Sequence, residues 1–141
     1  MLLQPLATYK IIDLSRVRAG PTAVRQLSDW GADVIKIEIP KENPNNDDDD
    51  TDRSDYQNMQ RNKRSIAINI KHPEGRDILK KLVVNADVLI ENFRPDVKFR
   101  LGIDYETLKT INPRLIYASI SGFGQTGPYR TRPGYDQIMQ G

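Results

Sequence analysis

Cysteine is absent from the sequence, and histidine occurs only once, at His72. Without cysteine the chain forms no disulfide, offers no thiol nucleophile and supplies no cysteine ligand to a metal ion. No apolar run approaches the roughly 20 residues that a membrane-spanning helix needs. The first ten residues, "MLLQPLATYK", also lack the basic leader and the long apolar core of a secretory signal. We therefore expect a cytoplasmic protein that does not enter the membrane.

Negative charge is concentrated in one segment. Residues 41–57, "KENPNNDDDDTDRSDYQ", carry two basic and seven acidic side chains, a local charge of −5, in a chain whose net charge is +2. The remaining residues therefore carry a net charge of +7. The segment has almost no apolar content, which predicts a disordered, solvated loop. Its aspartates lack the alternating ligands, the glycine and the late glutamate of an EF-hand, so we predict no metal site.

The composition is typical of one globular domain spanning residues 1–141, with 38% hydrophobic and 28% charged residues. Short apolar runs predict strands at residues 9–15, 32–40, 65–70, 87–93 and 114–123. Helices are expected at residues 20–31, 73–86 and 104–112, and from Asp136 onward. Because parallel strands need crossover connections, this alternation predicts an α/β fold with a doubly wound, mostly parallel sheet.

The first expected helix carries clear signals at both ends and along one face. Pro21 suits the first turn of a helix, and Gly31 suits its end. Between them Val24, Leu27 and Trp30 recur every three residues. We therefore expect these three side chains to pack against the sheet.

Cations gather where the expected strands end. In a doubly wound sheet, ligands bind at the carboxyl ends of the strands, near the point where the strand order reverses. The basic side chains at or just beyond these ends are those of Arg16, Arg18, Lys71, Arg94, Lys98 and Arg100. Guanidinium and ammonium groups bind phosphates, and helix amino termini add backbone donors. Each cation alone is more typical of a solvated surface, but their shared position predicts a polyphosphate ligand.

Standard nucleotide and nucleic-acid motifs are missing. The sequence contains neither G-x-G-x-x-G after its first strand nor G-x-x-x-x-G-K-[ST]. It also lacks a helix-turn-helix pattern, zinc ligands and the aromatic, basic strand of an RNA-binding sheet. We therefore expect no nucleic-acid partner.

Six segments of the sequence carry a family resemblance. In chain order they are "IIDLSRVRAGPTA", "LSDWGADVIKIEIP", "RNKRSIAINIKHPEG", "ADVLIENFRP", "RLGIDYETLKTINPRLIYASISGFGQTGP" and "RPGYDQIMQ". Together they cover nearly all of residues 8–140 except the acidic segment. In this order they resemble the amino-terminal part of family III CoA-transferases. That family includes formyl-CoA transferase, carnitine-CoA transferase-like enzymes and the related α-methylacyl-CoA racemases.

The resemblance implies that the chain binds coenzyme A, with acyl-CoA as substrate, in the large α/β domain of such an enzyme. The implied contacts are Val17, Arg18, Ala19, Ile68, Asn69, Lys71, Asn92, Phe93, Arg94, Arg100, Ser121, Gly122, Phe123 and Gly124. Arg100 is implied to reach a phosphate, and residues 121–124 to approach the pantetheine and thioester end. One position departs from the family, because Ile39 stands where many members carry an arginine near the adenosine phosphate. Arg61 or Lys63 is the expected substitute.

Catalysis in the family depends on an aspartate that attacks the acyl-CoA thioester, forms a mixed anhydride and then an aspartyl-CoA thioester, and passes CoA to a carboxylic acid. The resemblance places this aspartate beyond Gly141. We therefore expect no catalytic residue in this chain, and no activity from the chain alone. We also expect it to form a homo-oligomer or to bind a complementary downstream chain.

Two other functions stay open. The racemase branch has a histidine where this chain has Tyr135, and tyrosine, with a pKa of about 10, is a poor base at neutral pH. In that alternative Asp136 takes part in the reaction, whereas its simpler role is to cap a helix. His72 is expected to be a loop residue rather than a catalyst. The chain could also be a non-catalytic interaction module.

Overall fold

A computed structural model describes residues 4–40 and 54–141 of the chain, which form five strands and six helices. The strands are β1 (Lys10–Asp13), β2 (Asp33–Glu38), β3 (Arg64–Ala67), β4 (Val88–Glu91) and β5 (Ile116–Ser119). The helices are α1 (Ala19–Asp29), α2 (Ser54–Gln60), α3 (Pro73–Val83), α4 (Pro95–Leu101), α5 (Tyr105–Lys109) and α6 (Asp136–Gln140).

The five strands form one sheet in the order β3-β2-β1-β4-β5, and every adjacent pair is parallel. Ile12, on the central strand, lies between Ile35 of β2 and Leu89 of β4. After β1 the chain forms β2 and β3 on one side of that strand, and later forms β4 and β5 on its other side. The strand order therefore reverses between β1 and β4. The carboxyl ends of β1 and β4 therefore mark the edge at which doubly wound sheets bind ligands.

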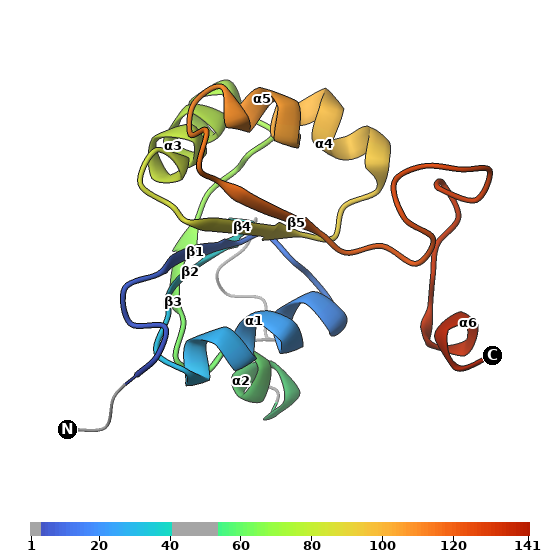
Figure 1. The fold of residues 1–141 in the computed structure, drawn as a ribbon, viewed down its shortest axis with the longest axis horizontal. Helices are drawn as coiled ribbons and strands as arrows, with labels where there is room; N and C mark the ends of the chain where they lie inside the picture. Colours follow the sequence, from blue (N-terminus) through green and yellow to red (C-terminus); the bar gives the residue numbers. More distant parts are fainter. Residues whose placement is uncertain (1–3, 41–53) are drawn as a thin grey trace.

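Helices cover both faces of the sheet, so the predicted doubly wound α/β fold is confirmed (Figure 1). Helices α3, α4 and α5 lie on one face and α1 and α2 on the other. Under α3–α5 the core is built around Leu79, Leu89 and Ile103, all fully buried. The smaller core under α1 contains Ile11, Val24 and Val34. Burial of these apolar side chains supplies the main favourable free energy of folding.

The helix boundaries follow local chemistry. Pro73 begins α3 and Pro95 begins α4, where a missing backbone N–H is tolerated. Asp104 precedes α5, and its side chain accepts a hydrogen bond from the Thr107 N–H. Gly102, in the left-handed conformation with φ of 62°, ends α4. The predicted start of the last helix at Asp136 is confirmed.

Several details differ from the sequence prediction. The exposed fraction of Trp30 is 58%, because α1 ends at Asp29 and Trp30 turns away from the sheet while Val24 and Leu27 pack against it. Residues 54–57, expected within the disordered acidic loop, form the first turn of α2. The remainder of that predicted loop, residues 41–53, lies outside the described residues. The stretch after β4, expected as a loop, contains α4.

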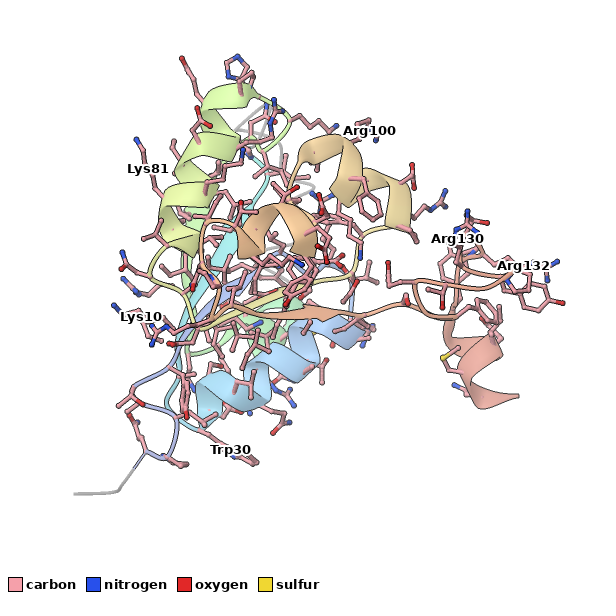
Figure 2. The ribbon with its side chains drawn as sticks, turned by 45° about the horizontal axis from the view of Figure 1, so that its top comes forward. Lys10, Trp30, Lys81, Arg100, Arg130 and Arg132 are labelled. Atoms are coloured by element: carbon pink, nitrogen blue, oxygen red, sulfur yellow. The ribbon has the colours of Figure 1, made fainter. Side chains whose placement is uncertain are left out.

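The carboxyl-terminal residues form an arm. Beyond β5 the chain leaves the edge of the sheet, forms irregular turns and ends in α6, away from the body (Figure 1). Gly122 and Gly134 meet within the arm, where a Cβ on Gly122 would lie 2.4 Å from the Gly134 Cα. Figure 2 shows Arg130 and Arg132 on this arm, far from Lys10 and Trp30. Within residues 4–40 and 54–141, no helix has the length and apolar character needed to cross a membrane.

Candidate ligand-binding site

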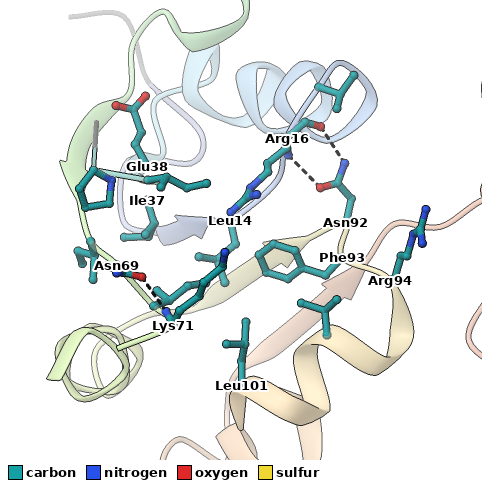
Figure 3. Close-up of a pocket in the computed structure, with 16 residues that line it drawn as sticks. Leu14, Arg16, Ile37, Glu38, Asn69, Lys71, Asn92, Phe93, Arg94 and Leu101 are labelled. Atoms are coloured by element: carbon teal, nitrogen blue, oxygen red, sulfur yellow. Dashed lines mark hydrogen bonds between the residues drawn. The ribbon is translucent and has the colours of Figure 1, made fainter. Parts of the chain in front are cut away.

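A cavity of about 670 Å³ opens at the carboxyl ends of the strands, next to the point where the strand order reverses (Figure 3). Its size is within the range of pockets that hold cofactors and small molecules. The residues that line it are Leu14, Arg16, Val17, Ile37, Glu38, Ile39, Pro40, Ile68, Asn69, Ile70, Lys71, Asn92, Phe93, Arg94, Val97 and Leu101. They come from the ends of β1, β2, β3 and β4 and from α4, so the fold gathers four distant segments into one wall.

Three cations line the cavity: Arg16, Lys71 and Arg94. Within the described residues, none of them lies within ion-pairing distance of a carboxylate. The Arg16 guanidinium lies 5.4 Å from the centre of the Phe93 ring, and its partial burial lowers the pKa of Arg16. Cations held near apolar walls without an internal counter-charge favour an anionic ligand.

The rest of the cavity wall is mostly apolar. Ile37 and Ile39 come from the end of β2, Ile68 and Ile70 from the segment after β3, and Leu101 from α4. Polar groups are confined to a few side chains and to the backbone of the loops. A ligand that fits here carries both negative charges and apolar or aromatic surface, because such pockets combine apolar walls with a few polar groups that fix orientation.

A buried charge cluster supports the loop that follows β1. The Asp13 side chain is fully buried and accepts hydrogen bonds from the backbone N–H and the hydroxyl of Ser15. Lys63 Nζ lies 3.0 Å from Asp13 Oδ2 and also donates to the Pro21 carbonyl at 3.1 Å. Lys36 Nζ donates to the Ser15 carbonyl. Burial lowers the pKa of Lys36 and of Lys63, against the opposing effect of the Asp13 carboxylate. This cluster fixes the loop between β1 and α1 through Ser15 and Pro21.

A second buried cluster joins β4, α4 and β5. Glu91, at the end of β4, has no exposed surface, and its Oε1 accepts a hydrogen bond from Lys98 Nζ at 3.2 Å and from the Ser119 hydroxyl. Its Oε2 accepts from the Phe93 backbone N–H at 2.7 Å. Lys98 Nζ also donates to the Ser119 hydroxyl at 2.9 Å. One carboxylate therefore holds α4, the end of β5 and the loop that carries Phe93 into the cavity.

The carboxylates near the cavity are already engaged. Asp13 and Glu91 are paired with lysines. Glu38, which lines the cavity, accepts a hydrogen bond from the hydroxyl of Tyr56 in α2, and burial together with this carboxylate raises the pKa of Tyr56. In Figure 3 the Glu38 carboxylate points away from Lys71 and Phe93. Each of these three carboxylates thus accepts a hydrogen bond from a side chain of the protein.

The structure brings together half of the predicted site residues. Val17, Ile68, Asn69, Lys71, Asn92, Phe93 and Arg94 all line the cavity. The others do not line it. Arg18 forms an exposed ion pair with Asp55, Ala19 is the first residue of α1, and Arg100 is exposed on α4 (Figure 2). Residues 121–124 lie where the arm leaves β5.

The structure corrects the expected role of two cations and adds a third cation to the cavity. Arg61 pairs with Asp29, and Lys63 pairs with Asp13. Neither residue lines the cavity, so neither takes the place of the arginine that many family members carry at the position of Ile39. Arg16 lines the cavity, although the resemblance did not include it among the contacts. Its position directly after β1, among the cations at strand ends, was the available signal.

Metal ligands and a catalytic histidine have no support in the described part of the chain. Residues 4–40 and 54–141 contain no group of three or more histidine, aspartate or glutamate side chains that could hold a metal ion. His72 precedes α3 on the surface, with Nδ1 3.8 Å from a Glu74 carboxylate oxygen. It does not line the cavity.

We expect Gly75→Ala to destabilise the fold next to the cavity. A Cβ on Gly75 would lie 2.1 Å from the carbonyl oxygen of Asn69 and 2.7 Å from the carbonyl carbon. Helix α3 and residues 68–71, which line the cavity, would therefore have to separate. Urea unfolding should show a loss of about 1–3 kcal/mol in the free energy of unfolding. Lys81→Ala, on the exposed face of the same helix, is the control and should stay within about 0.5 kcal/mol of the parent. Equal stability of Gly75→Ala and the parent would contradict this close packing.

A family profile and several known proteins match the sequence over nearly its whole length. A sequence profile of CoA-transferase family III matches residues 6–141. The succinate–glutarate CoA-transferase of Agrobacterium fabrum is 45% identical over 97% of this chain, which spans 37% of the relative. The acetyl-CoA:oxalate CoA-transferase of Acetobacter aceti is 50% identical over 96% of the chain and 36% of the relative.

A solved structure has a similar fold. The crystal structure of a CAIB/BAIF family protein from Brucella suis superposes with a TM-score of 0.82 and 44% identity, covering 96% of this chain and 38% of that protein. The chain thus spans little more than a third of the length of the relatives it matches. Because the family profile covers nearly the whole sequence, the chain belongs to CoA-transferase family III.

Proposed function

We propose that this chain is the CoA-binding part of an enzyme that moves CoA between an acyl-CoA and a carboxylic acid. The observation that carries the proposal is the cavity at the carboxyl ends of the strands, where Arg16, Lys71 and Arg94 have no carboxylate partner among the described residues. CoA combines three phosphate groups with an adenine ring and a long, uncharged pantetheine arm. That combination matches a wall made of cations and apolar side chains.

The proposed ligand contacts follow the cavity. Arg16, Lys71 and Arg94 bind phosphate groups, while the apolar wall around Ile68 and Phe93 takes the less polar parts of CoA. The other predicted contacts do not line the cavity, so they stay proposed on the resemblance alone. They are Arg18, Ala19, Arg100 and residues 121–124. For Arg18 such a contact requires the exposed pair with Asp55 to open.

We place the attacking carboxylate outside this chain. Asp13, Glu38 and Glu91 are the last residues of β1, β2 and β4, and each is held by a lysine or a tyrosine. The acceptor in the proposed reaction is a short dicarboxylic acid, because the relatives are named for succinate, glutarate and oxalate. A homo-oligomer or a complementary chain would then complete the active site.

Calorimetric titration tests the ligand assignment. Titrating CoA into the folded chain should give saturable binding at one site, and pantetheine, which lacks the phosphates, should bind much more weakly. ADP should compete with CoA for the same site. If CoA gives no heat of binding and no competition at millimolar concentration, while circular dichroism shows a folded chain, the proposed function is wrong.

Activity gives a separate prediction. We expect the purified chain alone to exchange no CoA between succinyl-CoA and glutarate, because we place the attacking carboxylate outside it and Glu38, which lines the cavity, is bound by Tyr56. The assay follows acyl-CoA species by chromatography, with a full-length relative as the positive control. Turnover by the chain alone that Asp136→Ala abolishes would place the nucleophile within this sequence.

A further inference from the structure

Val17 has an unusual backbone conformation for its residue type. Its φ is 66°, in the left-handed region that a β-branched side chain rarely adopts. The side chain is 82% exposed and lines the cavity, so burial of its own apolar surface does not offset the strain. Such strain persists only where the surrounding structure fixes the backbone, and it is frequent at ligand sites.

The Asn92 side chain fixes the residue before Val17. The Arg16 backbone N–H donates to Asn92 Oδ1 at 2.9 Å, and Asn92 Nδ2 donates to the Arg16 carbonyl at 2.8 Å (Figure 3). Arg16 and Asn92 lie just beyond the ends of β1 and β4, where the strand order reverses. The amide thus continues the pairing of the two strands past their last backbone contact.

Residues before Arg16 and after Val17 are also held. Ser15 is bound by the Asp13 carboxylate and by Lys36, both buried. Lys63 in turn links Asp13 to the Pro21 carbonyl at the start of α1. The backbone on both sides of Val17 is therefore fixed by side chains from β2, the segment before β3, and the end of β4. Among these, Asn92 is the one that contacts the adjoining residue and also lines the cavity.

We propose that Asn92 is a positioning residue: its amide holds the Arg16 backbone so that Val17 stays in the left-handed conformation and the loop is preformed for its ligand. This inference rests on the proposed function, in which that ligand is CoA. The resemblance implied a direct contact between Asn92 and CoA, whereas the structure directs both polar atoms of the amide at Arg16. A preformed loop favours binding because less conformational freedom is lost when the ligand enters.

A double-mutant cycle between Asn92 and Val17 tests the proposal. Without Asn92 the loop relaxes to a less strained conformation, and CoA must restore the strained one. Asn92→Ala should therefore weaken CoA binding about tenfold, which corresponds to about 1.4 kcal/mol. In a Val17→Gly background the left-handed conformation carries no Cβ strain. There, Asn92→Ala should weaken binding by less than about threefold.

Melting temperature gives a readout that needs no ligand. Val17→Gly should raise the melting temperature of the parent by a few degrees, because relief of strain exceeds the added entropy of the unfolded chain. The same change should lower the melting temperature of Asn92→Ala, because only the entropy effect remains once the loop has relaxed. Asn92→Asp, which keeps one acceptor but loses the donor to Arg16, gives a second variant if Asn92→Ala does not fold.

Asn69→Ala is the matched control, since Asn69 also lines the cavity and its Oδ1 accepts the Lys71 backbone N–H at 3.1 Å. Its effect on CoA affinity should be the same with Val17 and with glycine at that position. Equal losses for Asn92→Ala in both backgrounds, with Val17→Gly raising both melting temperatures, would overturn the positioning role and leave Asn92 as a plain contact. Absence of CoA binding in the parent would instead refute the proposed function, and the melting temperatures would still decide this inference.

Discussion

Replacing Lys98 by methionine lowers the free energy of unfolding by about 3–5 kcal/mol, the usual cost of removing one partner from a buried ion pair. The physical reason is the environment of Glu91, which has no exposed surface and loses its only cationic partner among the described residues. The Phe93 N–H and the Ser119 hydroxyl remain, but they do not neutralise the carboxylate. Methionine keeps the length of the lysine stem, so lost packing contributes little.

Urea unfolding at neutral pH measures this effect, with the double variant Glu91→Gln/Lys98→Met as the control. The double variant buries no charge and should recover most of the lost stability, because buried pairs contribute little net stability once both charges are removed. A Lys98→Met protein within 1 kcal/mol of the parent would contradict the account of this cluster as a buried, mutually dependent pair.

Removing the cations of the cavity is expected to have the second large effect. Arg16→Met should weaken CoA binding about 10- to 150-fold, because a hydrogen bond to a charged group contributes about 1.5–3 kcal/mol. Arg94→Met should have a similar effect, and the double variant should bind CoA too weakly to titrate. Both residues line the cavity and have no carboxylate partner in the described part of the chain.

A cation at the opposite edge of the sheet controls for net charge. Lys81 lies on α3 beside the amino-terminal ends of β1 and β2, and Lys81→Met should leave CoA affinity within about twofold (Figure 2). Arg18→Met and Arg100→Met test a different question, namely whether the contacts proposed from the resemblance extend beyond the residues that line the cavity. Equal losses from Lys81→Met and Arg16→Met would indicate nonspecific attraction rather than a site at the carboxyl ends of the strands.

Most of the fold follows from patterns in the sequence. Buried strands stand out as short apolar runs, and the alternation with helices determines that they run parallel. Helix α2 was missed because its seven residues, "SDYQNMQ", have no buried face and follow the acidic run. It is attached instead by the contacts of Asp55 with Arg18 and Tyr56 with Glu38. Helix α4 carried usable signals, because Pro95 begins it and Gly102 ends it.

The site was predicted partly from the positions of cations after strands and partly from the family resemblance. Lys71 and Arg94 follow the ends of expected strands, and parallel strands bring these ends to one edge, whereas Asn92 was implied by the resemblance. Val97 and Leu101 were not predicted to line the cavity, since they belong to α4, which lies in a stretch expected as a loop. The pairing of Asn92 with Arg16 joins residues 76 positions apart, so no local pattern indicates it.

The central claim, that CoA binds at the carboxyl ends of the strands, is tested most directly by amide chemical-shift mapping of the isotope-labelled chain during a CoA titration. The account predicts the largest shifts in residues 14–17, 68–71 and 92–94, which surround the cavity, and little change around Lys10 and Lys81 at the opposite edge of the sheet. Saturable shifts confined to that opposite edge or to the arm, with residues 14–17 and 92–94 unchanged, would contradict it.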